Sequence, residues 1–111
     1  SLLTSHNDTS LEYIGLKNRV TAVKNLAILA EKCSIDGIVC SPSDISNIKD
    51  SVSNLIYVTP GIRLNDDNDD HVRIYTPKKA LSLGSDYLVI GRPITEAKEP
   101  MDVVKKIIST I

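Results

Sequence analysis

The sequence lacks phenylalanine and tryptophan, and only 4% of its 111 residues are aromatic. A core must therefore be built from isoleucine, leucine, valine and alanine, as is typical of helices packed on a parallel sheet. An excess of charge of one sign is also missing, because 13 lysines and arginines face 14 aspartates and glutamates. That balance excludes a broad electrostatic surface for nucleic acid or an anionic membrane, so we expect neither partner. Any positive charge that matters must be local.

Long apolar runs are absent as well. No stretch of about 18 apolar residues is present, and no charged-then-apolar leader begins the chain, so we expect no membrane span and no secretion. No histidine lies near the two cysteines, Cys33 and Cys40, to complete a zinc pattern. Their apolar neighbours indicate two reduced, buried thiols in a cytoplasmic protein.

Segments with strand and helix patterns alternate along the chain. Strands are expected at residues 1–5, 35–40, 55–58 and 86–90, the last as a run buried on both faces. Since residues 1–5 already read as the end of a strand, we expect that a preceding part is missing; a cloning scar or processing would give the same start. Regular alternation with short connections predicts βα units and a parallel sheet.

The helices are indicated by apolar stripes and by caps. A short helical turn is expected at residues 11–16, capped by Thr9 or Ser10 and ended by Gly15, and longer helices at 19–33, 44–52, 76–83 and from Pro100. Proline follows a cap residue at Ser41-Pro42 and Thr76-Pro77. Two helices have stripes expected to face inward: Val20, Val23, Leu26, Ala27, Ala30 and Cys33 in the first, and Val103, Val104, Ile107, Ile108 and Ile111 in the last.

Ligands of parallel α/β folds bind beyond the carboxyl ends of the strands. Two of the expected strand ends carry a glycine turn with an arginine, in Pro60-Gly61-Ile62-Arg63 and in Gly91-Arg92-Pro93. Glycine lets the backbone approach a ligand, and arginine offers a planar fork of donors. The pair predicts an anion site, most simply for phosphate. The alternative is two ordinary turns whose arginines form surface ion pairs.

Four segments in this order and spacing resemble the second half of orotidine 5'-phosphate decarboxylase of the bacterial type, over about residues 2–111. They are Leu3-Thr4-Ser5, Asp36-Gly37-Ile38-Val39-Cys40-Ser41, Val58-Thr59-Pro60-Gly61-Ile62-Arg63 and Ile90-Gly91-Arg92-Pro93-Ile94-Thr95. The family fold is a (β/α)8 TIM barrel of typically about 250 residues. The resemblance implies that residues 1–111 form a single partial domain, the C-terminal half of a phosphate-binding barrel with its parallel strands five to eight.

The resemblance also assigns roles to residues. Thr4 would approach the ribose and base of the ligand, and Pro60 would line the base pocket. Three residues would hold the 5'-phosphate, namely Arg63, Gly91 and Arg92. His71 stands where the family usually has a glutamine that contacts the phosphate; a solvated loop residue is the alternative.

In this family, orotidine 5'-phosphate is converted to UMP and CO2 in de novo pyrimidine biosynthesis without metal or cofactor. The chemistry depends on an Asp-x-Lys-x-x-Asp segment, which this sequence does not contain. We therefore expect no activity from this chain alone. The acidic run at residues 66–70 lacks the glycine and distal glutamate of an EF-hand loop, so we expect no metal site.

Two other interpretations stay open. The chain could be part of a sugar-phosphate decarboxylase or aldolase of the same suprafamily, or an inactive half-barrel that binds phosphate or assembles with a partner. Unpaired sheet edges must be covered in a soluble protein. The expected partner is the missing N-terminal half of the barrel or a second copy in a homodimer.

Overall fold

The computed structural model describes residues 8–12, 15–16, 18–64 and 75–111. In chain order the elements are α1 (Asp8–Glu12), α2 (Arg19–Lys32), β1 (Gly37–Val39), α3 (Pro42–Ile48), β2 (Ile56–Thr59), α4 (Pro77–Ser82), β3 (Tyr87–Leu88), α5 (Arg92–Thr95) and α6 (Pro100–Thr110). The strand expected at residues 1–5 lies outside the described residues. The remaining alternation of strands and helices is as predicted, except for the short helix α5, which the sequence analysis did not predict.

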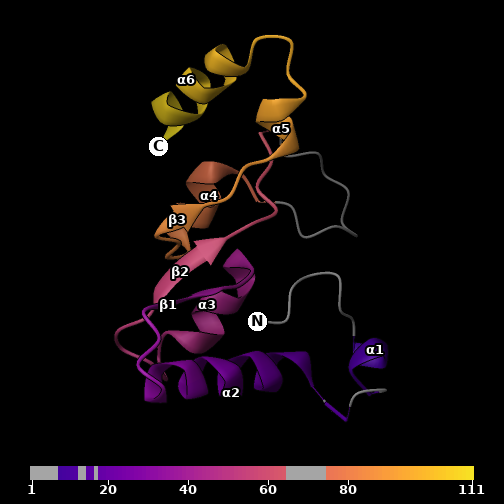
Figure 1. The fold of residues 1–111 in the computed structure, drawn as a ribbon, viewed down its shortest axis with the longest axis vertical. Coiled ribbons are helices and arrows are strands. Elements are labelled where there is room, and N and C mark those ends of the chain that lie inside the picture. The colour runs from indigo at the N-terminus through magenta and orange to yellow at the C-terminus, as the bar shows by residue number, and fades with distance from the viewer. Residues whose placement is uncertain (1–7, 13–14, 17, 65–74) are drawn as a thin grey trace.

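The three strands form one parallel sheet in the order β1-β2-β3. Gly37 of β1 pairs with Ile56 of β2, and a Cβ at Gly37 would lie 2.6 Å from the Ile56 carbonyl oxygen. Only glycine therefore allows β1 and β2 to approach this closely. Figure 1 shows α2 at one end of the molecule, α5 and α6 at the other, and the three strands between them.

The helix caps follow the sequence. Ser41 and Asp44 form a capping box with Pro42 in the first turn of α3, and the Thr76 side chain accepts a hydrogen bond from the Lys79 backbone N–H at the start of α4. Helix α2 ends one residue earlier than predicted and α3 ends four residues earlier, at Ile48. Helix α1 begins at Asp8, before the two expected caps. Gly15 closes the following turn with φ +77°.

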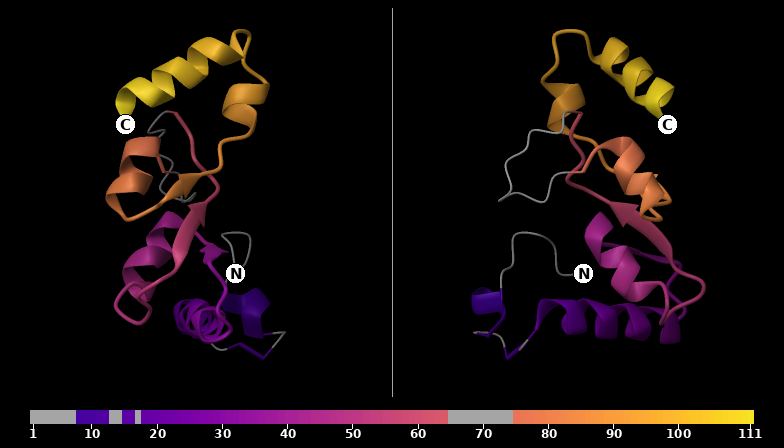
Figure 2. Two further views of the ribbon diagram at one scale, coloured as in Figure 1. Left: turned by 60° about the vertical axis from the view of Figure 1, so that its left-hand side comes forward. Right: turned by 180° about the vertical axis from the view of Figure 1, so that it is seen from behind.

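The main core lies between α2, α3 and one face of the sheet. Figure 2 (left) shows α3 and α4 on the same side of the strands. The buried members of this core are Val23, Ala27, Ala30, Cys40, Ile45, Ile48, Val52, Leu55 and Tyr57. The opposite face of the sheet is different, because Val39, Tyr87 and Val89 are 44%, 63% and 48% exposed. The prediction that residues 86–90 are buried on both faces is therefore wrong for this chain.

Other expected core positions are exposed too. These are Val20 and Leu26 in α2 with Cys33 directly after it, and Ile108 in α6 with Ile111 directly after it. Helix α6 packs on α4 and α5, which cover only the side that carries Ile107. The stripes predict which residues favour burial, but the described part of the chain offers no neighbour to cover them.

The molecule is extended, with principal extents of 44 × 31 × 20 Å and a radius of gyration of 15.2 Å. A compact domain of this length would have a radius of gyration of about 13 Å. The open parallel sheet and the elongated shape are those of half a barrel. No helix in the described part of the chain is both long and apolar enough to cross a membrane.

Candidate functional site

The carboxyl ends of β2 and β3 lie side by side. Thr59 is in register with Leu88, and the Val89 backbone N–H donates to the Thr59 carbonyl oxygen at 2.9 Å. The turns with Arg63 and Arg92 therefore both leave the same edge of the sheet. The structure brings together Pro60, Arg63, Gly91 and Arg92, four of the six predicted site residues, at this edge. The other two, Thr4 and His71, lie outside the described residues, as does the acidic run at residues 66–70.

The turn after β2 is fixed by its backbone. Gly61 adopts φ +79°, a backbone conformation that residues other than glycine rarely adopt. Ile62 is fully buried and forms a parallel bridge with Tyr75, and the Arg63 backbone N–H donates to the Tyr75 carbonyl oxygen at 3.0 Å. The half-buried Arg63 thus has an anchored main chain. Within the described residues, its Nη1 donates to the neighbouring Ile62 carbonyl oxygen, at 3.3 Å.

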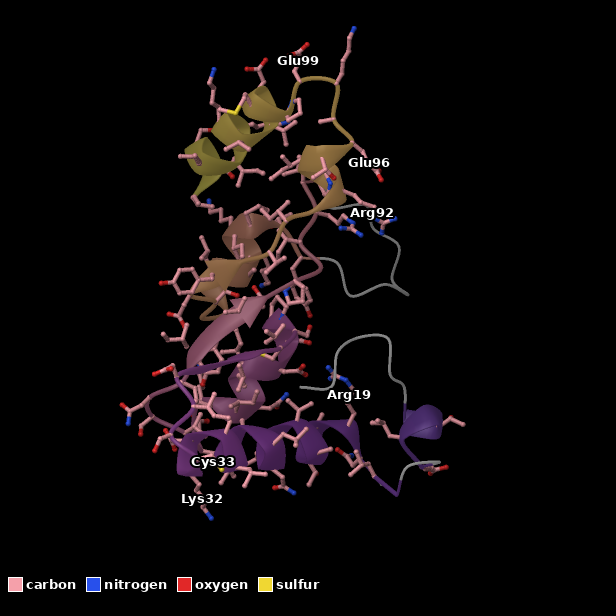
Figure 3. The ribbon with its side chains drawn as sticks, in the orientation of Figure 1. Arg19, Lys32, Cys33, Arg92, Glu96 and Glu99 are labelled. Carbon is pink, nitrogen blue, oxygen red and sulfur yellow. The ribbon has the colours of Figure 1, made fainter. Side chains whose placement is uncertain are left out.

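The turn after β3 is more open. Gly91 is exposed and precedes α5, and its carbonyl oxygen accepts from Ile94 N–H at 2.8 Å. No described atom lies within 4 Å of a Cβ added at Gly91, so none of the described residues fills the space beside its backbone. Arg92 is the first residue of α5, and Figure 3 shows its side chain on the same side of this short helix as Glu96. Within the described residues, the Arg92 guanidinium forms neither a hydrogen bond nor an ion pair.

Among the described residues, no carboxylate forms an ion pair with either arginine at this edge. The ion pairs found in the described ranges join Arg19 to Asp44 and Lys105 to Asp102. Neither Arg63 nor Arg92 has a carboxylate partner there. A guanidinium binds phosphate oxygens through strong charge-assisted hydrogen bonds. Two of them beside free backbone at a glycine turn can hold a phosphate group.

A buried ion pair lies near the carboxyl end of β1 (Figure 3 labels Arg19). Arg19 at the start of α2 donates through Nη1 and Nη2 to the two carboxylate oxygens of Asp44 at 2.6 and 2.7 Å, and both residues are at most 5% exposed. Asp44 Oδ2 also accepts from the Ser41 backbone N–H at 3.3 Å. The pair joins α2 to the turn after β1. Local sequence patterns do not reveal this pairing, because the two residues are 25 positions apart.

The hydroxyl groups of Thr59 and Ser85 connect the end of β2 to the chain that leads into β3. Thr59 is fully buried, and its Oγ1 shares a hydrogen bond with Ser85 Oγ and donates to the Tyr87 carbonyl oxygen at 3.4 Å. These bonds tie the last residue of β2 to the chain entering β3. The position of the Pro60–Arg63 turn thus depends on a polar contact that the sequence pattern did not reveal.

The cysteines differ from each other, in part against prediction. Cys40 is buried, and burial raises the pKa of its thiol to about 12. Cys33 was also expected to be buried, but it is exposed at the C-terminal end of α2, on the flank that no described element covers. Both are free thiols. Among the described residues, no group of three or more His, Cys, Asp or Glu side chains is placed to hold a metal ion.

Comparison with known sequences identifies relatives over the whole chain. A profile of the orotidine 5'-phosphate decarboxylase / HUMPS family matches residues 1–107. Orotidine 5'-phosphate decarboxylase of Nitrosospira multiformis is 43% identical over 110 residues, which are 96% of this chain and 46% of that protein. The Dichelobacter nodosus enzyme is 43% identical over 114 residues, covering 100% of this chain and 50% of the relative. The chain thus spans about half the length of the curated relatives it matches.

Solved structures agree with the fold. The crystal structure of orotidine 5'-phosphate decarboxylase from Lactobacillus acidophilus superposes with a TM-score of 0.79 at 32% identity, covering 99% of this chain and 46% of that one. The enzyme from Pyrococcus horikoshii OT3 superposes with a TM-score of 0.70 at 22% identity, covering 47% of that chain, and supports the fold alone. The described sheet and helices therefore correspond to about half of a TIM barrel, as the sequence predicted.

Proposed function

This chain belongs to the orotidine 5'-phosphate decarboxylase / HUMPS family, and from that premise we propose that it supplies the phosphate-binding half of an orotidine 5'-phosphate decarboxylase. The reaction is the decarboxylation of orotidine 5'-phosphate to UMP in pyrimidine biosynthesis. Arg63 and Arg92 bind the 5'-phosphate, with the backbone at Gly91 close to its oxygens. Pro60, at the end of β2, lines the base pocket.

One observation carries this proposal. Two guanidinium groups without a described carboxylate partner follow glycine turns at the joined ends of β2 and β3. In TIM barrels, a phosphate site is frequently formed by the loops after strands seven and eight. If β1, β2 and β3 are strands six, seven and eight, Arg63 and Arg92 occupy those two loops.

The division of labour follows from the sequence. The family's Asp-x-Lys-x-x-Asp segment is absent from these 111 residues, so the carboxylates and the lysine that protonates the pyrimidine must come from elsewhere. We propose that this chain alone binds the phosphate end of a nucleotide but performs no decarboxylation. Thr4 and His71 keep their proposed contacts with the ribose or base and with the phosphate.

The nucleotide branch is favoured over the sugar-phosphate branch of the family. Curated relatives that are 41–44% identical to this chain, among them the Nitrosospira multiformis and Dichelobacter nodosus proteins, are orotidine 5'-phosphate decarboxylases. A proline-glycine-isoleucine-arginine turn after β2, followed by a long connection to Tyr75, is the part of this site that resembles them.

The test is a decarboxylation assay with orotidine 5'-phosphate. We expect no turnover by the chain alone, and turnover when it is co-expressed with the part of the Nitrosospira multiformis enzyme that it does not match. Arg92→Ala should abolish most of that activity, whereas Lys24→Ala removes an exposed cation on α2 and should leave it unchanged. Equal activity of the Arg92→Ala and Lys24→Ala proteins would refute the phosphate role. Turnover by the unaided chain would refute the division of labour.

A further inference from the structure

The two arginine turns lie on separate loops, and their relative position depends on how β2 and β3 are joined. Strand β3 is only two residues long, so its ladder with β2 contributes few hydrogen bonds. Side chains add to that ladder. The Asp86 carboxylate accepts from the Tyr57 backbone N–H at 2.7 Å near the starts of the two strands. Thr59 and Ser85 form a hydroxyl contact at the end of β2.

The hydroxyl contact at the end of β2 has a defined direction. Thr59 Oγ1 donates its single proton to the Tyr87 carbonyl oxygen at 3.4 Å, so the Ser85 hydroxyl must donate to Thr59 Oγ1. Thr59 is fully buried and Ser85 is 7% exposed. Both hydroxyl protons are thus used within the protein, and we expect neither group to contact a ligand.

The turn that carries Arg63 is anchored at both ends to the chain around α4. At its far end, the Arg63 backbone N–H donates to the Tyr75 carbonyl oxygen at 3.0 Å, just before the cap of α4. At its near end, Thr59 contacts Ser85, whose backbone N–H donates to the Ala80 carbonyl oxygen in α4 at 3.2 Å. The first anchor is made by the main chain. The second depends on two side chains, so substitution can remove it.

We propose that Thr59 and Ser85 are positioning residues for phosphate recognition, which hold the turn with Arg63 where its guanidinium and that of Arg92 reach the same phosphate group. This inference rests on the phosphate role proposed above for the two arginines. Charge-assisted hydrogen bonds from two guanidinium groups to one phosphate require a placement accurate to about 0.5 Å. A turn released from the chain entering β3 loses that placement, although both arginines are still present.

A merely structural role of the hydroxyl contact is the alternative, because buried hydroxyl groups are normally paired in proteins. Replacing both partners of a buried hydrogen bond by apolar groups of similar shape changes stability little, whereas removing one partner leaves the other unsatisfied. The double substitution Thr59→Val/Ser85→Ala therefore removes the contact at a small cost in stability. Its effect on the ligand can then be measured separately.

The experiment titrates UMP and uridine into the complex of this chain with the co-expressed part of the Nitrosospira multiformis enzyme, which we call the assembled complex. The two ligands differ only in the phosphate. We expect Thr59→Val/Ser85→Ala to lower the affinity for UMP at least about tenfold, and the affinity for uridine to stay within about twofold. The conservative Thr59→Ser keeps a hydroxyl group at this position and should bind UMP as the unaltered complex does.

Asp86→Ala is the matched control, because it removes a side-chain contact between β2 and β3 that lies away from the arginine turns. It should lower the stability and leave the ratio of UMP to uridine affinity unchanged. Urea denaturation of each protein measures the stability. If the double variant is unstable, Ser85→Ala alone gives the same comparison, since Thr59 then keeps its bond to the Tyr87 carbonyl oxygen.

The possible outcomes separate this inference from the proposed function. A double variant that is stable but has lost most of its preference for UMP supports the positioning role. A preference that survives the double substitution, or equal losses of UMP and uridine affinity, overturns the positioning role and leaves the phosphate role of the arginines intact. An unaltered complex that binds UMP and uridine equally would contradict the phosphate role, and this inference with it.

Discussion

Arginine is used in two opposite ways in this molecule. Arg19 is buried between α2 and α3, and both of its terminal nitrogens bind Asp44. Arg63 and Arg92, at the ends of β2 and β3, have no carboxylate partner within the described residues. A buried charge must be paired because desolvation is costly. A guanidinium at a partly exposed strand end can stay unpaired and keep its donors for a ligand. The first arrangement stabilises the fold, and the second leaves donors available for the phosphate that we propose this site binds.

Removing the partner of the buried arginine should give the largest effect on stability. Asp44→Ala removes the carboxylate that both terminal nitrogens of the buried Arg19 bind, and we expect the broken ion pair to lower the free energy of unfolding by about 3–5 kcal/mol. Urea denaturation followed by circular dichroism measures this. The control is Asp102→Ala, which breaks an ion pair whose side chains are both 73% exposed and should cost at most about 1 kcal/mol. Similar losses in the two variants would show that the buried pair has no special role.

The core between α2, α3 and the sheet should protect the thiol of Cys40 from alkylation. Because burial raises the Cys40 pKa from 9.0 to about 12, its thiolate fraction at pH 8 falls about a thousandfold. Iodoacetamide should therefore modify the exposed Cys33 and spare Cys40, as peptide mass spectrometry would show. A raised pKa in the folded state also means that stability present below pH 9 is lost as the pH rises towards about 12. Cys40→Ala should lessen that alkaline loss, and equal labelling of both thiols would contradict the assignment.

At the carboxyl ends of β2 and β3, substitutions should affect ligand binding more than the stability of the fold. Arg92→Ala in the assembled complex should weaken UMP binding by about 1.5–3 kcal/mol, since a charge-assisted contact is lost. The free energy of unfolding of the chain should change by less than about 0.5 kcal/mol because Arg92 is exposed. Calorimetric titration and urea denaturation measure the two quantities. If Arg92→Ala lowered the stability but left the affinity for UMP unchanged, Arg92 would have a structural role and not a ligand-binding role.

Alanine substitutions at two glycines with similar φ values distinguish the effect of backbone strain from an effect on ligand binding. Gly15 and Gly61 have φ values of +77° and +79°, and at neither position does a described atom lie within 4 Å of an added Cβ. Alanine at either position should cost about 1 kcal/mol of stability through strain alone. Gly61→Ala should in addition weaken UMP binding, because it shifts the turn that carries Arg63. If Gly15→Ala weakened UMP binding equally, the turn after β2 would have no particular part in the site.

Local signals in the sequence were sufficient for the three described strands and the longer helices between them, for the Ser41-Pro42 and Thr76-Pro77 helix starts and for the two arginine turns, but not for the short helix α5. These features depend on neighbouring residues. The exposure of Val39, Tyr87 and Val89 could not be predicted, because an apolar pattern indicates a preference for burial and not the presence of a covering surface. The Arg19–Asp44 pair was missed since it joins residues far apart in the sequence.

The central claim is that Arg63 and Arg92 bind a nucleotide 5'-phosphate. Titration of the assembled complex with UMP and with uridine tests it most directly, because these ligands differ only in that phosphate. We predict that UMP binds about a hundredfold more tightly than uridine, and that the double variant Arg63→Ala/Arg92→Ala removes most of this difference while uridine affinity is unchanged. Equal affinities for UMP and uridine in the unaltered complex, or a preference for UMP that survives the double substitution, would contradict the claim.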